Sequence, residues 1–236
     1  MKKRLLFLLI VPMFLFGQLK FLPSSNGEVV EHTYYSLSYL EEHEQAEWVH
    51  YKLNSTMLKG EIPRKKNYTI DRKVSTGSAK TSDYTNSGFD RGHLVPAADM
   101  KMDFTSVKEA AYMSNISPQK PKFNQAVWKK LEEHARDLAK KSELYITTGG
   151  VLSSANLKKI GKNNVSVPDQ FYKIIYDVKN QKMFAYLMPN KKIESREKYV
   201  VTVDAIEALT GIDFYADLSD DLEDKLEASE EHLINQ

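Results

Sequence analysis

The chain of 236 residues contains no cysteine. This absence excludes disulfide bonds, thiolate metal ligands, a cysteine nucleophile and a lipid anchor attached through cysteine. The chain also lacks an apolar run of the roughly twenty residues that a membrane-spanning helix requires, since the run over residues 5–16 is shorter. No internal repeat is evident. The length is nonetheless sufficient to bury a large core without covalent cross-links.

The N-terminus carries the pattern of a secretory signal peptide. Lys2, Lys3 and Arg4 precede the apolar run, and Gly17 follows it. A basic region before a short apolar region is typical of such peptides. We therefore expect residues 1–17 to be a signal peptide cleaved near Gly17, and the mature protein to be secreted or periplasmic with no stable membrane association. Leu15 is larger than the small residue usual before a cleavage site, so an uncleaved N-terminal anchor stays open.

The distribution of charge says more than its sum. The formal net charge is +1 for the whole chain, and −2 without residues 1–17, because 30 basic residues then face 32 acidic ones. Basic side chains gather near residues 64–73 and 120–130, and the charged residues of the segment 213–231 are all acidic except Lys225. A basic groove attracts phosphates within a Debye length of about 8–10 Å. We expect such a groove, with ordinary solvated lysines as the alternative.

Composition predicts one domain after a flexible lead-in. We expect residues 18–44 to be the lead-in and residues 45–236 a single domain with an acidic C-terminal tail, since no composition break appears between residues 45 and 215. Order should begin near Glu47, where residues 48–53 alternate apolar and polar as a half-buried strand does. Residues 59–88 are expected to form a long loop over the site.

The remaining elements follow from apolar spacing and turn residues. Helices are predicted over 106–111, 124–141 and 204–209, the last ending at Gly211. Strands are predicted over 112–116, 144–148, 171–178 and 182–188, the last two as a hairpin. Leu222 and Leu226 favour a helix of the tail docked on the surface. This order predicts an α+β fold with a central antiparallel β-sheet flanked by helices.

One run of polar residues points to acid–base chemistry on a phosphate. The run is Asp90, Arg91, Gly92 and His93. Histidine accepts a proton near neutral pH because its ordinary pKa is about 6.5, so His93 is the candidate general base, with a buried structural histidine as the alternative. Arg91 lies two residues earlier, on the same face of an extended strand, and its guanidinium suits a phosphate. We expect Asp90 to anchor the local turn and Gly92 to allow close backbone approach.

Asn124 and Glu132 are the candidate metal-site residues. Asn124 offers a neutral carbonyl oxygen, which suits Mg²⁺ because this ion keeps most of its waters; a helix N-cap is the alternative. Trp128 and Glu132 fall four and eight residues later, near one stripe of a helix. Glu132 could therefore orient water around the ion. We expect Trp128 to pack in the core rather than to stack on bases.

Three segments in order, residues 90–99, 114–119 and 124–132, resemble the DNA/RNA non-specific endonuclease family. Further matches run from Trp48 to Phe214, so the resemblance spans most of the chain after residue 17. The resemblance implies a ββα-metal finger active site, phosphodiester hydrolysis in DNA and RNA with little sequence preference, and 5′-phosphate products. It also implies one Mg²⁺, for which Mn²⁺ could substitute. It assigns Asn124 as the sole direct metal ligand, Glu132 a supporting role, and Asn115 and Gln119 to the substrate or to the hydrogen-bond network of the finger.

The resemblance leaves one basic residue undecided. A phosphate contact is expected upstream of Asp71, and either Arg64 or Lys66 could supply it; lysine would lose the bidentate geometry of arginine.

We therefore expect the protein to be an exported Mg²⁺-dependent endonuclease that does not discriminate between the sugars of nucleic acids, and so cleaves DNA and RNA. Two alternatives stay open. One is a nucleic-acid-binding protein of the same fold with little or no turnover. The other is a phosphodiesterase acting on a non-nucleic-acid substrate, because a fold does not specify what is esterified.

Overall fold

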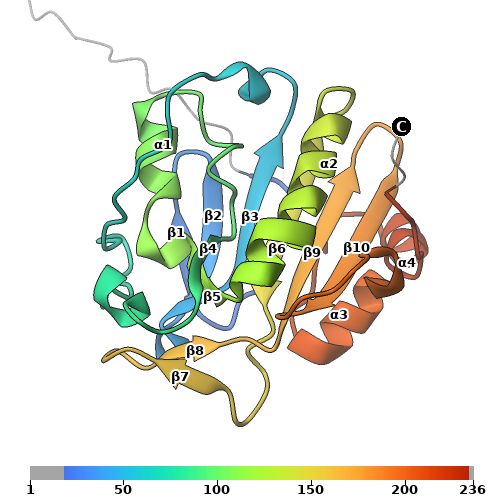
Figure 1. Ribbon diagram of the computed structural model, residues 1–236. Coiled ribbons are helices and arrows are strands. Elements are labelled where there is room, and N and C mark those ends of the chain that lie inside the picture. The colour runs from blue at the N-terminus through green and yellow to red at the C-terminus, as the bar shows by residue number, and fades with distance from the viewer. Residues whose placement is uncertain (1–18, 234–236) are drawn as a thin grey trace, which may run out of the picture.

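The computed structural model describes residues 19–233, so the expected signal peptide over residues 1–17 lies outside the described residues. Its centre is a seven-stranded sheet in the order β1-β2-β3-β6-β9-β10-β11, with every neighbouring pair antiparallel (Figure 1). These strands are β1 (Glu28–Glu31), β2 (Tyr35–Leu40), β3 (Gln45–Leu53), β6 (Leu144–Gly150), β9 (Gln170–Asp177), β10 (Lys182–Pro189) and β11 (Val200–Val201). Two smaller antiparallel pairs are β4 (Asp90–His93) with β5 (Ile116–Gln119), and β7 (Lys158–Ile160) with β8 (Val165–Val167).

Helices cover both faces of the large sheet (Figure 1). The α-helices are α1 (Phe104–Ala110), α2 (Lys129–Ala139), α3 (Val203–Thr210) and α4 (Asp220–Glu227). A π-helical segment, Phe123–Trp128, leads directly into α2. Short 3₁₀ turns occupy Glu41–His43, Met57–Lys59, Thr81–Tyr84, Met113–Asn115 and Glu197–Tyr199. The predicted α+β fold with a central antiparallel sheet is confirmed, and within residues 19–233 no helix has the length and apolarity needed to cross a membrane.

The sheet separates two hydrophobic cores. Side chains alternate between the faces of a strand, so Val49 packs with α2 on one side while its neighbour Trp48 packs with α3 on the other. Ile175 and Ile174 divide in the same way on β9. The core with α2 underlies the cavity described below, and the core with α3 and α4 lies on the far face.

The prediction of a flexible lead-in over residues 18–44 is wrong. β1 and β2 lie within this segment and extend the large sheet, with β2 paired to β3 from Tyr35 opposite Tyr51 to Leu40 opposite Gln45. Tyr35 and Leu37 are fully buried. The physical reason is visible in residues 35–40, where bulky residues alternate with serine and so bury one face of a strand.

Most other predicted elements are confirmed, with one exception. β3, β6 and the β9–β10 hairpin lie where expected. α3 ends at Gly211, which has a left-handed φ of 72°, and α4 packs through Leu222 and Leu226. The strand predicted over 112–116 is wrong, because a 3₁₀ turn occupies Met113–Asn115 and the strand begins only at Ile116.

Candidate active site

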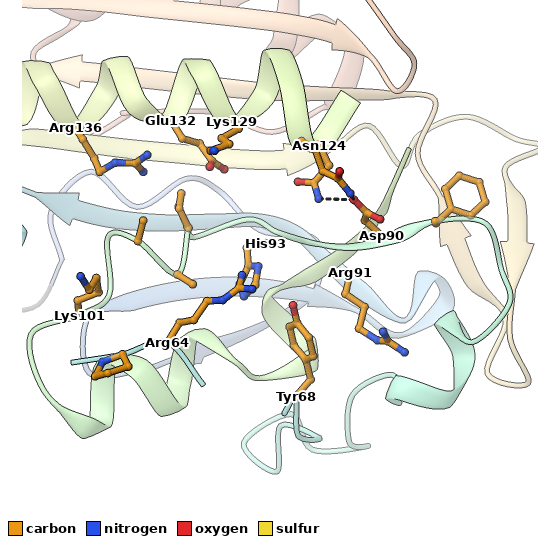
Figure 2. Close-up of a pocket in the computed structure, with 16 residues that line it drawn as sticks. Arg64, Tyr68, Asp90, Arg91, His93, Lys101, Asn124, Lys129, Glu132 and Arg136 are labelled. Atoms are coloured by element: carbon orange, nitrogen blue, oxygen red, sulfur yellow. Dashed lines mark hydrogen bonds between the residues drawn. The ribbon is translucent and has the colours of Figure 1, made fainter. Parts of the chain in front are cut away.

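The predicted site residues meet around one open cavity of about 1020 Å³. It lies between the loop before β4, the strand β4 itself and the helix that includes α2 (Figure 2). Its charged and polar lining residues are Arg64, Tyr68, Asp90, Arg91, His93, Lys101, Asn124, Gln125, Lys129, Glu132 and Arg136. Basic side chains outnumber acidic ones in this lining, so the cavity favours an anionic ligand. Lys66 and Lys120, which the sequence placed in the basic groove, do not line it.

The strand pair β4–β5 holds His93 at the cavity. Asp90 pairs with Gln119 and His93 with Ile116. Gly92 is required at the centre of β4, because a Cβ built there would lie 2.2 Å from Gln119 Oε1. The close approach expected at Gly92 is therefore made by the Gln119 side chain of the neighbouring strand β5.

Asn115 and Gln119 lie inside the protein and not in the cavity. Both are fully buried. Asn115 accepts a hydrogen bond from Val95 N at 2.8 Å and donates to the carbonyl oxygens of Val95 and Ala110, each at 3.0 Å. Their assignment to substrate binding is thus corrected. Asn115 belongs to the hydrogen-bond network of the finger, and Gln119 packs beneath Gly92.

His93 presents a neutral imidazole to the cavity. Burial and, to a smaller extent, the positive charge of Arg64 together lower the pKa of His93 to about 4. Figure 2 shows Arg64 extending toward His93. The Tyr68 ring lies 5.5 Å from the imidazole, centroid to centroid. An unprotonated nitrogen is therefore available at neutral pH.

Asp90 fixes the orientation of Asn124. Asn124 Nδ2 donates to Asp90 Oδ2 at 2.9 Å (Figure 2). Gln125 Nε2 donates to the same oxygen at 2.8 Å. A carboxylate can only accept, so the amide turns its nitrogen to Asp90 and leaves its oxygen free for another partner. The N-cap alternative for Asn124 is wrong, because the helical segment begins at Phe123 with Lys122 as its cap. Asp90 thus does more than anchor a turn.

The π-helical segment brings Asn124 and Glu132 to the same side. Eight residues span about 2.2 turns of an α-helix, which would set the two residues well apart around the axis. The wider turn of a π-helix holds more residues, so eight residues come closer to two complete turns. Asn124 and Glu132 consequently both line the cavity. Trp128 points into the core between Phe123 and Phe171, which confirms the prediction that it packs there.

A group of charged side chains, which we call the cavity-wall cluster, stands behind Glu132. It comprises Asp99, Glu132, Arg136 and Lys173. Asp99 is paired, with Arg136 Nη1 at 2.9 Å and Tyr51 Oη at 3.0 Å. Lys173 is fully buried and its ammonium has no hydrogen-bond partner among the described residues, lying 4.9 Å above the Trp128 ring. Burial raises the pKa of Glu132 and lowers the pKa of Lys173.

Sequence reasoning missed Arg136, Lys173 and Lys101, although two of them carried a signal. Arg136 falls four residues after Glu132, one turn further along the same helix face. Lys173 lies among the apolar and aromatic residues of the segment 171–176, where a charge is unusual.

Arg64 and Arg91 occupy different parts of the cavity. Arg91 lines it, as the two-residue spacing from His93 predicts, but its guanidinium turns away from His93. It donates to Thr81 O at 2.8 Å and lies 5.9 Å from the Tyr68 ring and 5.8 Å from the Tyr84 ring. Arg64 lines the cavity next to His93, whereas Lys66 does not line it. The geometry therefore favours Arg64 over Lys66 as the upstream phosphate contact.

Comparison with known proteins agrees with this geometry. The DNA/RNA non-specific endonuclease family matches residues 16–221. The mitochondrial nuclease EXOG of Danio rerio is 32% identical over 214 residues, covering 82% of this chain and 62% of the relative. A nuclease of Nostoc sp. is 32% identical over 210 residues, covering 82% and 75% respectively. This chain thus spans less than two thirds of the zebrafish protein.

A solved structure supports the same assignment. The crystal structure of the EndoG/EndoGI complex superposes with a TM-score of 0.76 at 27% identity, and the match covers 82% of this chain and 87% of that chain. Both structures carry the ββα-metal fold, here formed by β4, β5 and the helix from Phe123 into α2. Sequence and fold together show that the chain belongs to the DNA/RNA non-specific endonuclease family.

Proposed function

We propose that this protein is a Mg²⁺-dependent endonuclease that hydrolyses phosphodiester bonds in DNA and RNA. The observation that carries the proposal is the meeting of His93, Asn124 and Glu132 in one cavity with basic walls. The names of the relatives, nuclease EXOG and nuclease, support it.

The residues present fit a hard divalent cation. The oxygen of Asn124 is freed by the bond from its Nδ2 to Asp90, and the carboxylate of Glu132 lines the same cavity. Neutral and anionic oxygen donors suit Mg²⁺, and Mn²⁺ accepts the same donors. Asn124 would hold the ion directly, and Glu132 would orient water in its shell. The ion would supply charge neutralisation on the phosphoryl and leaving oxygens.

The side chains of this chain then divide the remaining work. His93, neutral at pH 7, accepts the proton of the attacking water. Arg64 lies next to His93 and stabilises the charge that develops on the phosphoryl oxygens, with Arg136 on the opposite wall. Arg91, held at the cavity edge by Thr81, contacts a flanking phosphate.

Cleavage of a plasmid tests the base. Purified protein is incubated with supercoiled DNA and Mg²⁺, with and without a chelator, and His93→Ala is compared with His134→Ala, a histidine on α2 outside the cavity. We expect His93→Ala to lower the rate about 10²–10⁴-fold, with DNA binding retained and His134→Ala unaffected. Wild-type turnover by His93→Ala would refute the assignment of His93 as the general base.

Two other results would favour the alternative functions. If the wild type binds DNA but does not cleave it in a chelator-sensitive way, the protein is a nucleic-acid-binding protein without turnover. If it hydrolyses only simple phosphodiesters, it is a phosphodiesterase for a non-nucleic-acid substrate.

A metal titration tests the ligand. Asn124→Ala should raise the Mg²⁺ concentration needed for half-maximal cleavage, whereas Gln125→Ala, which removes the other amide bound to Asp90, should leave it unchanged. An unchanged metal dependence in Asn124→Ala would place the ligand elsewhere.

Export is a separate proposal that depends on residues 1–17. N-terminal sequencing of protein recovered outside the producing cytoplasm should begin near residue 18. Retention of Met1 on a membrane-bound product would instead support the uncleaved anchor.

A further inference from the structure

Three carboxylates converge on the face of the sheet opposite the catalytic cavity. Asp204 and Glu207 come from α3 and Glu227 from α4, and one oxygen of each lies within 4.8 Å of the others. Both helices pack on the far core, through Val203, Ile206 and Leu226. This group, which we call the acidic triad, is therefore separated from His93 by the whole thickness of the sheet.

Glu227 distinguishes the acidic triad from ordinary surface acids. Its side chain belongs to a residue that is only 5% exposed, and its Oε1 is buried without a hydrogen-bond partner among the described residues. Within residues 19–233, none of the three carboxylates forms an ion pair with a basic side chain. A buried carboxylate without a donor is unfavourable, so the arrangement calls for a partner that supplies positive charge.

The surrounding acids strengthen this requirement. Burial raises the pKa of Glu227 to about 8, and the negative charges of Glu207 and Glu223 raise it in the same direction. Burial likewise raises the pKa of Glu207. Glu207 is nonetheless held in place, since its Oε1 accepts a hydrogen bond from Phe214 N at 2.7 Å. The local structure thus holds Glu207 in place and buries Glu227, while Asp204 is exposed to solvent.

We propose that the acidic triad binds one Ca²⁺ that joins α3 to α4. Calcium accepts six to eight oxygen ligands in flexible geometry, which three carboxylates and water entering on the side of Asp204 can provide. Magnesium demands near-ideal octahedral geometry and dehydrates reluctantly, so it fits a partly buried carboxylate less well. Because the triad lies on the far face of the sheet, the ion stabilises the fold and takes no part in cleavage.

Calcium titration of the whole protein tests the site. Isothermal calorimetry of the wild type should show binding of one Ca²⁺ at the triad, with a dissociation constant of about 0.1–1 mM, the range of extracellular calcium-binding modules. At 10 mM Ca²⁺ the Tm should rise by roughly 3–10 °C. Asn124→Ala should keep this rise, because the catalytic cavity is not involved.

Matched substitutions on the two helices make the test specific. Glu227→Gln should abolish the calcium-dependent rise in Tm, while its Tm without calcium stays equal or increases, because a neutral amide replaces a carboxyl whose charged form is disfavoured at this buried position. Asp204→Asn, at an exposed position where folding is not in question, should weaken binding by about tenfold or more. Asp224→Asn, which removes an equal charge from the exposed side of α4, should respond as the wild type does.

Two results would overturn the proposal. The first is a wild type whose Tm and heat of binding are insensitive to Ca²⁺, which would leave Glu227 as a protonated carboxyl. The second is a calcium response that survives in both Glu227→Gln and Asp204→Asn, which would place the ion elsewhere.

Discussion

Two groups of buried charges pack on the α1 and α2 side of the protein, and they differ in how their charges are paired. The first, which we call the histidine cluster, comprises His32, Asp71, Glu109 and Ser114. His32 Nε2 lies 2.9 Å from Asp71 Oδ2 and its Nδ1 lies 3.7 Å from Glu109 Oε1. The second, the cavity-wall cluster, leaves the ammonium of Lys173 without a partner.

The pKa directions follow this difference. In the histidine cluster burial opposes ionisation, yet the hydrogen bond between His32 and Asp71 and the attraction between His32 and Glu109 lower the pKa of both carboxylates and raise that of His32. All three shifts thus favour the charged forms of these groups. In the cavity-wall cluster the effect of burial prevails. It raises the pKa of Glu132 and lowers the pKa of Lys173, so both shifts favour the neutral forms of these groups. Removal of one partner from a pair of buried charges strongly destabilises a fold, whereas strongly perturbed groups beside a cavity are candidates for function.

The largest effect should come from breaking the histidine cluster. Asp71→Asn leaves His32 buried without its principal partner, so we expect a loss of about 3–5 kcal/mol in the free energy of unfolding and a fall in Tm of about 6–20 °C. Asp137→Asn, which removes a surface pair with Lys140, should change the stability by less than about 1 kcal/mol. Thermal and urea denaturation measure the stability of both variants. Equal stability of Asp71→Asn and Asp137→Asn would contradict the view that the buried histidine cluster matters more to the fold than a surface ion pair.

The next effect should come from the cavity-wall cluster, and in activity instead of stability. Glu132→Gln should lower plasmid cleavage about 10–100-fold, as expected when a group that orients a metal shell is lost. Its Tm should stay equal or rise, because a neutral amide replaces a carboxyl whose charged form is disfavoured by burial. Glu133→Gln, the exposed neighbour paired with Lys129, is the control and should keep full activity. If Glu132→Gln destabilises the protein but the folded fraction keeps full turnover, Glu132 serves stability and not activity.

The sequence predicts the fold where local patterns are strong. The alternation of apolar and polar residues predicted β3. The β9–β10 hairpin and the end of α3 at Gly211 were likewise predicted from residues within or next to each element. β1 and β2 were missed because the polar residues 23–27 dominated the composition, although residues 35–40 alternate clearly. The bond from Tyr35 Oη to Glu109 O, across 74 positions, shows why such strands are ordered only by tertiary contacts.

The site was predictable as a set of residues, but not as a geometry. His93, Asn124 and Glu132 were named from motif and spacing. The π-helical segment that aligns Asn124 with Glu132 leaves no simple trace in the sequence, because it replaces one backbone hydrogen-bond pattern by another. Asn115 looked like a substrate residue because its amide is polar, and only the fold shows that backbone groups satisfy it.

A smaller effect should separate the two upstream basic residues. Arg64→Ala removes a charge beside His93 and should lower cleavage by about tenfold or more, as loss of a charge-assisted hydrogen bond to phosphate does. Lys66→Ala removes an equal charge outside the cavity and should have little effect at moderate salt. Rates at several salt concentrations measure both. A larger loss in Lys66→Ala would mean that the loop rearranges on binding DNA.

The smallest effect should be the pH dependence of the histidine cluster. Because the pKa of His32 is raised in the folded protein, its stabilising contribution is complete below about 6.5, the ordinary histidine value, and is lost as pH rises through the folded pKa. Asp71 and Glu109 have lowered pKa values, so their contributions are present above their ordinary values and are lost as pH falls. Stability from this cluster should therefore be greatest near pH 5–6.

Comparison of the Tm at pH 5.5 and 8.5 isolates the histidine. The wild type should lose more stability between these two values than His32→Gln does, because the variant has no proton to release at this position. His50 supplies an internal control, since burial lowers its pKa to about 4 and it stays neutral throughout this range. An identical loss in the wild type and in His32→Gln would show that His32 is neutral in the folded protein. The histidine cluster would then resemble the cavity-wall cluster in leaving a buried group uncharged, and paired charge would no longer separate the two.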